Sequence, residues 1–188
     1  MAFLRTEEQV QEKVTSFKKW GAVLISVLFG LVILAAAGQF GLTTHALINL
    51  PTLALLTIAA IVDIQRKMIP DWLTLPGLAW ALVASAFFGW PRLSDALLGV
   101  ILCGGALLLF ALISRGSIGG GDVKLMAMIG ASLGWRWGFG VLAFAQLAAA
   151  GLAICLLITR RKGRKDALPF GPFLAAFAVL AILGKPMQ

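Results

Sequence analysis

The chain has 188 residues, of which 60% are hydrophobic and only 13% are charged, whereas soluble domains carry about 45–50% apolar and about 25% charged residues. This composition excludes an ordinary soluble domain and predicts a membrane protein. The net charge is +8. Because the basic residues are interspersed with apolar runs, they point to membrane topology rather than to nucleic acid.

A polar segment, residues 1–19, precedes the first apolar run. Its apolar residues recur at roughly helical spacing among charges, which predicts an amphipathic helix at the membrane interface; they are Phe3, Leu4, Val10, Val14 and Phe17. The segment also contains Glu7, Glu8 and Glu12. It is therefore unlike the charged start of a secretory signal peptide.

The rest of the chain, residues 20–188, is predicted to be one membrane-embedded domain. A bilayer core is crossed by roughly 20 apolar residues, and seven runs are expected to cross it: 20–38, 46–63, 72–90, 95–113, 123–135, 137–159 and 168–184. The fifth run is short and either starts below the membrane surface or re-enters. Such long continuous runs suit helices rather than barrel strands, so the predicted fold class is an all-α polytopic helix bundle.

The charges between the runs orient the chain. With a cytoplasmic N-terminus, 13 of the 16 basic residues lie in cytoplasmic segments, and only Arg92, Arg136 and Lys185 lie outside. Cytoplasmic loops are enriched in Lys and Arg. The excess of basic residues in the cytoplasmic segments therefore supports this orientation. It also supports counting the short fifth run as a span.

No metal site or cofactor is predicted. The two cysteines, Cys103 and Cys155, lie inside apolar runs and are far from any CxxC spacing. They are expected to be small buried apolar residues. The single histidine, His45, cannot build a metal site by itself and is expected in a solvated loop.

Two acids are expected at the same depth. Asp63 follows the apolar run 53–62 without a break, and Asp122 begins the fifth run after Gly119, Gly120 and Gly121. The topology places both at the cytoplasmic edge of the membrane, where ionisable groups are costly and usually functional. The alternatives are that Asp63 pairs with Arg66 or Lys67, and that Asp122 is an N-cap.

Two neighbouring carboxyl groups can hydrolyse a peptide without a cofactor. They do not ionise easily together, so one keeps a proton and the other acts as a base toward water. Asp122 lies near a helix N-terminus, where the dipole favours the anion, and Asp63 lies near a C-terminus. The hypothesis from sequence is that Asp122 is the base and Asp63 holds the proton.

The glycines before Asp122 have two interpretations. Gly119, Gly120 and Gly121 allow backbone angles with positive φ and a close approach of another chain, which suits a flexible peptide-binding loop. For the glycines taken alone, a simple turn between two helices is the favoured interpretation.

Three motifs resemble one family. The string GGGDVKL at 119–125 contains a GxGD motif and resembles the second catalytic motif of type IV prepilin peptidases. The string DIQRKMIPDWLT at 63–74 resembles the first, and PFGPF at 169–173 resembles the PxGP-type segment that opens the last helix. The motifs stand in the family's order, with 58 residues between Asp63 and Asp122, and the resemblance covers about residues 47–184.

The resemblance implies a membrane aspartic endopeptidase of the bacterial inner membrane. Its partner would be a type IV pilin-like precursor, whose short basic leader is removed at the cytoplasmic face. Asp63 and Asp122 would be catalytic. Lys124 would hold a substrate carbonyl, tune Asp122 or serve only topology, and the positions of possible substrate contact are Pro70, Asp71, Pro169, Gly171 and Pro172.

The Pro169–Pro172 segment has two interpretations of its own. It leaves backbone groups free for an extended substrate, or it starts a helix with Pro in the first turn. Asp71 is expected to orient the first loop or to meet the leader.

One departure from the family narrows the expected activity. Larger members carry a domain with paired CxxC motifs and also methylate the new N-terminus. This sequence has no CxxC, so cleavage without methylation is expected, as in the short peptidases of tight-adherence or Flp-type pilus systems. The alternatives are a small proton-coupled transporter and a non-enzymatic assembly protein of a pilus or secretion apparatus.

Overall fold

The computed structural model describes residues 44–66, 68–114, 118–158 and 170–184. This part of the chain is helical and contains no strand. The helices are α2 (Thr44–Arg66), α3 (Asp71–Phe88), α4 (Leu93–Gly99), η1 (Val100–Gly104), α5 (Gly105–Ile113), α6 (Gly120–Leu133), α7 (Trp135–Ile158) and α8 (Gly171–Gly184). The predicted all-α bundle is therefore confirmed.

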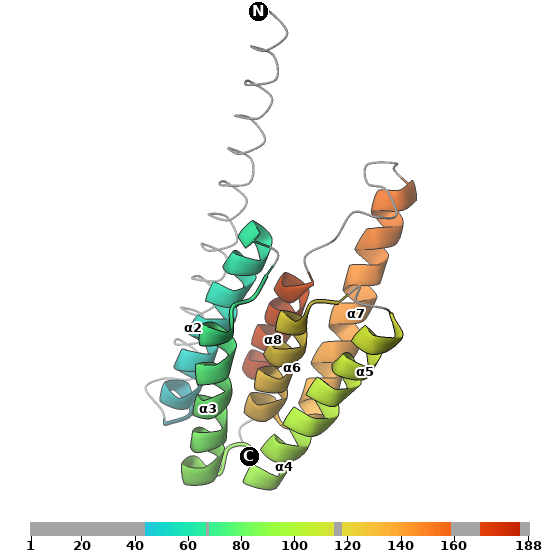
Figure 1. The fold of residues 1–188 in the computed structure, drawn as a ribbon. Coiled ribbons are helices and arrows are strands. Elements are labelled where there is room, and N and C mark those ends of the chain that lie inside the picture. The colour runs from blue at the N-terminus through green and yellow to red at the C-terminus, as the bar shows by residue number, and fades with distance from the viewer. Residues whose placement is uncertain (1–43, 67, 115–117, 159–169, 185–188) are drawn as a thin grey trace, which may run out of the picture.

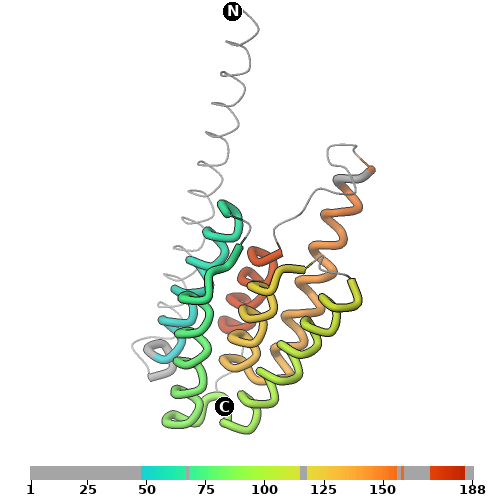
Figure 2. The backbone as a smooth tube through the Cα atoms, viewed as in Figure 1, coloured from blue at the N-terminus to red at the C-terminus, as the bar shows by residue number. Residues whose placement is uncertain are grey.

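The helices follow the apolar runs closely. The run at 72–90 forms α3, the run at 137–159 forms α7, and the run at 95–113 forms α4, the π-helical η1 and α5 in unbroken succession (Figure 2). Four helical stretches are long and apolar enough to cross a membrane: Ile48–Arg66, Asp71–Phe88, Leu93–Ile113 and Trp135–Cys155. The predicted run 20–38 and the segment 1–19 lie outside the described residues, so the count of seven remains a prediction.

Helix α6 lies at the centre of the bundle. It contacts α3, α4, η1, α5, α7 and α8 (Figure 1), and almost every residue from Leu125 to Leu133 is buried. At 14 residues it is shorter than a typical membrane span. Because protein surrounds it, its polar first turn does not have to face lipid.

Glycines allow the closest contact in this core. A Cβ built on Gly99 would overlap the carbonyl oxygen of Gly130, and one built on Gly130 would overlap that of Gly99. The backbones of α4 and α6 therefore touch directly, as glycine allows between membrane helices. Large apolar side chains on the outer faces, such as Phe87, Ile101 and Leu112, are exposed and suit contact with lipid.

The two ends of the bundle differ. The end of α2 and the beginnings of α3, α6 and α8 meet at one end (Figure 1). At the opposite end, α3 stops at Gly89 and α6 stops at Gly134, which have φ of 66° and 80°. Such angles favour glycine, and they let the chain turn into α4 and α7.

Candidate active site

Asp63 and Asp122 are brought together from different helices. Asp63 lies in the last turn of α2 and Asp122 in the first turn of α6. Their exposed fractions are only 5% and 9%. The two carboxyl groups are close enough for their charged forms to repel each other. Two buried acids facing each other are costly as structural elements, and this cost favours a chemical role.

The environment of Asp63 favours its charged form. The backbone N–H of Gly171, the first residue of α8, donates a hydrogen bond of 3.0 Å to Oδ2 of Asp63. Hydrogen bonds to a carboxylate, and the positive end of a helix dipole, both stabilise the anion. The argument from sequence considered only the C-terminus of α2, and it missed the N-terminus of α8 on the other side of Asp63.

Asp122 has a different environment: burial and the charge of Asp63 raise its pKa to about 6, although a backbone hydrogen bond from Gly119 acts to lower it. The backbone N–H of Asp122 donates to the carbonyl oxygen of Gly119 at 3.1 Å, but its Oδ1 is buried and has no hydrogen-bond partner among the described residues. A buried oxygen without a donor suits an uncharged carboxyl group. The helix begins at Gly120, so Asp122 lies inside its first turn, and Gly119 is the N-cap residue.

The glycines before Asp122 do not form the loop with positive φ angles that one of the two interpretations described. Gly120 and Gly121 are helical, and positive φ angles occur in the described chain only at Gly89 and Gly134. The predicted close approach is present at Gly121, where an added Cβ would lie 2.9 Å from Cβ of Ile69 and 3.0 Å from its carbonyl oxygen. The first turn of α6 is therefore packed against the α2–α3 connection.

An ion pair joins the same two segments. Lys124 Nζ lies 2.6 Å from Oδ1 of Asp71 at the start of α3, and both side chains are about half exposed. Pro70 is the N-cap of α3, and its carbonyl oxygen accepts from the N–H of Leu73. Asp71 thus links the start of α3 to α6, and its orienting role stays a prediction. Lys124 is engaged in this contact with Asp71.

The segment before α8 forms a helix start. Pro172 stands in the first turn of α8, as the second interpretation of this motif predicted. Phe170 accepts from the N–H groups of Phe173 and Leu174 through its carbonyl oxygen, and the Gly171 N–H is used by Asp63. These donors are therefore not free for an extended substrate. Pro169 lies outside the described residues.

Gly171 is a site residue whose role the sequence did not reveal. A Cβ at this position would lie 2.8 Å from Oδ2 and 3.0 Å from Cγ of Asp63. Only glycine lets the start of α8 approach the carboxyl group so closely. In the sequence, the Gly-Pro pair indicates the start of a helix, because Pro is common in a first helical turn. It does not indicate which side chain this helix start contacts.

The described residues bear on the predictions made for metal sites and for the two cysteines. The described residues contain no group of three or more His, Cys, Asp or Glu side chains that could hold a metal ion. Cys103 is buried, as expected, whereas Cys155 is exposed on the outer surface of α7, so that half of the prediction was wrong. An exposed thiol there still suits an apolar, lipid-facing surface.

The sequence as a whole matches a known family. The family model of the type IV leader peptidases matches residues 50–163, more than half of the chain. The chain belongs to the type IV leader peptidase family. The matched residues include both Asp63 and Asp122, whereas Gly171 lies beyond them.

Individual members of the type IV leader peptidase family show the same likeness. The chain is 32% identical over 165 residues to a prepilin leader peptidase/N-methyltransferase of Pseudomonas putida, covering 85% of this chain and 57% of that protein. It is 34% identical over 154 residues to the Bacillus subtilis (strain 168) protein of the same name, covering 79% and 60%. It is 35% identical over 161 residues to the Burkholderia pseudomallei (strain K96243) protein of the same name, covering 81% of this chain and 51% of that protein. The chain thus spans about half the length of these curated relatives, and no solved structure matches it.

Proposed function

We propose that the protein is a membrane aspartic endopeptidase that removes the leader peptide from type IV prepilin-like precursors. The observation that carries the proposal is the meeting of Asp63 and Asp122, two buried acids from α2 and α6. Relatives that match the same residues are named prepilin leader peptidases. The family and the geometry support the same type of reaction.

The contacts favour Asp63 as the base and Asp122 as the acid. Asp63, stabilised as an anion by the Gly171 N–H, takes a proton from water as the water oxygen attacks the peptide carbonyl carbon. Asp122 donates its proton to the carbonyl oxygen. The tetrahedral intermediate then collapses, the C–N bond breaks, and a proton is transferred to the leaving amine. This assignment reverses the one argued from helix ends alone.

The orientation of the chain favours cleavage at the cytoplasmic face of the bacterial inner membrane. The end of the bundle that contains Asp63 and Asp122 also contains Arg66 and Lys124, and basic residues mark cytoplasmic segments. A precursor would place its hydrophobic helix in the bilayer beside the bundle and its leader at this end. The scissile bond would then reach the two acids without crossing the membrane.

Cleavage without methylation is part of the proposal. The sequence contains two cysteines, at 103 and 155, and therefore no paired CxxC motif. The proposed reaction needs only the two carboxyl groups and water.

The decisive experiment mixes the purified protein in detergent with a pilin precursor and follows the shorter product by mass. Asp63→Asn and Asp122→Asn should each lower kcat by about 10³-fold or more, because the two acids act as a unit. Asp95→Asn, a matched change of a partly exposed acid in the first turn of α4 at the opposite end of the bundle, should cleave at the wild-type rate. The product should carry an unmethylated N-terminus in the presence of a methyl donor. Wild-type rates in either variant of the pair would reject Asp63 and Asp122 as the catalytic pair, whereas a precursor left uncut by the wild-type protein would favour a non-enzymatic assembly role.

A further inference from the structure

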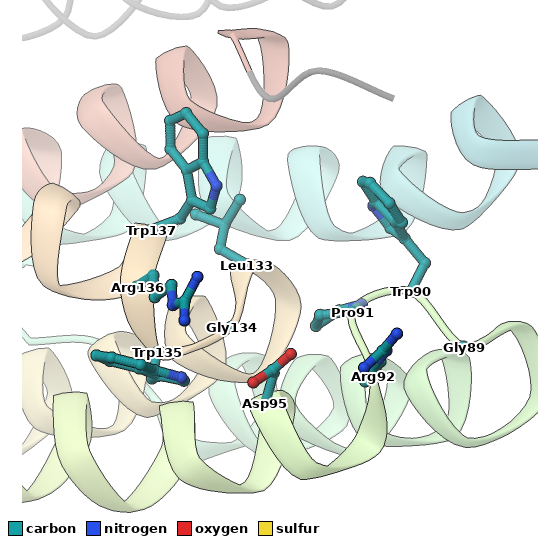
Figure 3. A pocket seen from close by; sticks show the side chains of 10 residues that line it. All are labelled: Gly89, Trp90, Pro91, Arg92, Asp95, Leu133, Gly134, Trp135, Arg136 and Trp137. Atoms are coloured by element: carbon teal, nitrogen blue, oxygen red, sulfur yellow. The ribbon is translucent and has the colours of Figure 1, made fainter. Parts of the chain in front are cut away.

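A pocket of about 810 Å³ opens at the end of the bundle opposite Asp63 and Asp122. It is formed where α3 ends, α4 begins, α6 ends and α7 begins. Figure 3 shows the residues that line it: Gly89, Trp90, Pro91, Arg92, Asp95, Leu133, Gly134, Trp135, Arg136 and Trp137. Its volume lies in the range of ligand pockets, about 300–1,000 Å³.

Opposite charges line this pocket without pairing. Arg92, Arg136 and Asp95 all face it, but no ion pair within 4.0 Å joins them in the described part of the chain. The Asp95 carboxylate lies between the two arginine side chains in Figure 3. Arginine and aspartate side chains that are not paired with each other can bind one ligand that carries an anionic group and a cationic group at separate positions.

The two arginines suit a phosphate group. Guanidinium groups bind phosphate oxygens through paired N–H donors. Arg136 is oriented by the Trp135 ring, with 5.2 Å between its guanidinium carbon and the ring centroid. In the orientation argued from loop charges, only three basic residues lie on this side of the membrane, and two of them line one pocket. Topology alone disfavours basic residues there.

The surroundings suit a lipid rather than a soluble ligand. Trp90, Trp135 and Trp137 line the pocket, and tryptophan is enriched at the level of lipid head groups. Phe87 and Phe88 at the end of α3 are 81% and 54% exposed. These rings lie directly before Gly89 in the chain and offer an apolar surface beside the pocket for acyl chains.

We propose that this pocket binds the head group of phosphatidylethanolamine. Arg92 and Arg136 bind the phosphate, and Asp95 accepts hydrogen bonds from the primary ammonium group. Asp95 distinguishes this lipid from two others that share its phosphate. Phosphatidylglycerol has no cation for Asp95, and the ammonium of phosphatidylcholine has no N–H to donate.

Native mass spectrometry of the delipidated full chain tests the proposal by titration with each of the three lipids. The wild-type protein should bind phosphatidylethanolamine about three- to tenfold more tightly than the other two, as expected for a partly exposed charged hydrogen bond. Asp95→Asn should abolish the preference over phosphatidylglycerol. Arg92→Gln and Arg136→Gln should weaken all three lipids about three- to tenfold, and the Lys variants should weaken them less.

The control is Arg66→Gln, which removes an exposed arginine at the opposite end of the bundle and should leave the ratio of affinities unchanged. Equal affinities for the three lipids in the wild-type protein would overturn the proposal without recourse to any variant. An unchanged preference in Asp95→Asn would also overturn it, provided that its unfolding temperature equals that of the wild type. If glycerophosphoethanolamine, which lacks acyl chains, competes at equal concentration, the ligand is a soluble amine phosphate and the lipid assignment is wrong.

Discussion

The backbone N–H of Gly171 donates a 3.0 Å hydrogen bond to Oδ2 of Asp63, joining positions 108 apart in the chain. This contact fixes the carboxyl group of α2 against the first turn of α8. It gives the last helix a direct part in the site, although the family match ends at residue 163.

Gly171→Ala is expected to impair cleavage strongly. The new Cβ would lie 2.8 Å from Oδ2 of Asp63, so either the carboxyl group or the start of α8 must move. A displacement of about 1 Å at a reacting group costs on the order of 10²-fold in rate. The measurement is kcat/KM for a prepilin-like substrate. Gly184→Ala in the same helix, where an added Cβ meets nothing within 4 Å, is the matched control and should cleave normally.

Two adjacent glycines of the GxGD motif should respond differently to alanine. At Gly121 an added Cβ meets the backbone of Ile69, whereas at Gly120 it meets nothing within 4 Å. Gly121→Ala should therefore lower the free energy of unfolding by about 1–3 kcal/mol and reduce activity by separating α6 from the α2–α3 connection. Gly120→Ala should be neutral or slightly stabilising, because alanine favours helix. Equal behaviour of the two variants in thermal unfolding and cleavage assays would refute this packing.

The sequence predicted the helices better than it predicted the site. Apolar runs set the helix positions because lipid requires each span to satisfy its own backbone; hence the run at 72–90 gave α3 at Asp71–Phe88. Loop charges correctly predicted that Asp63 and Asp122 would lie at one end. The Gly171 contact, the packing of Gly121 on Ile69 and the gathering of Arg92, Asp95 and Arg136 were beyond prediction, because each depends on how distant helices pack.

The ion pair between Asp71 and Lys124 should contribute little to stability. Both side chains are about half exposed, and such pairs are typically worth about 0.2–1 kcal/mol. A double-mutant cycle with Asp71→Asn and Lys124→Gln, measured by unfolding, should give a coupling energy in that range. If Lys124 acts only through this pair, the two variants should lower kcat/KM equally. A much larger loss in Lys124→Gln would assign Lys124 a direct contact with substrate.

The contact between Gly99 and Gly130 should be among the least tolerant in the core. An added Cβ on either glycine would overlap a carbonyl oxygen of the facing helix. A backbone atom cannot move aside as easily as the end of a flexible side chain. Gly99→Ala and Gly130→Ala should each destabilise the protein by about 1–3 kcal/mol or more. Gly105→Ala, on the same helical run but without any atom within 4 Å, should be neutral. Thermal unfolding in detergent distinguishes the three.

The assignment of Asp63 as the anion predicts opposite effects of two isosteric substitutions on stability. Asp63→Asn replaces a charged acceptor of the Gly171 N–H with a neutral one and should cost about 1–2 kcal/mol, the difference between charged and neutral hydrogen bonds. Asp122→Asn retains the shape of a protonated carboxyl group at a position where Oδ1 has no donor. It should be neutral or stabilising. Unfolding of both variants at neutral pH decides between the two assignments, because a proton on Asp63 in the resting protein would make Asp122→Asn the more damaging change.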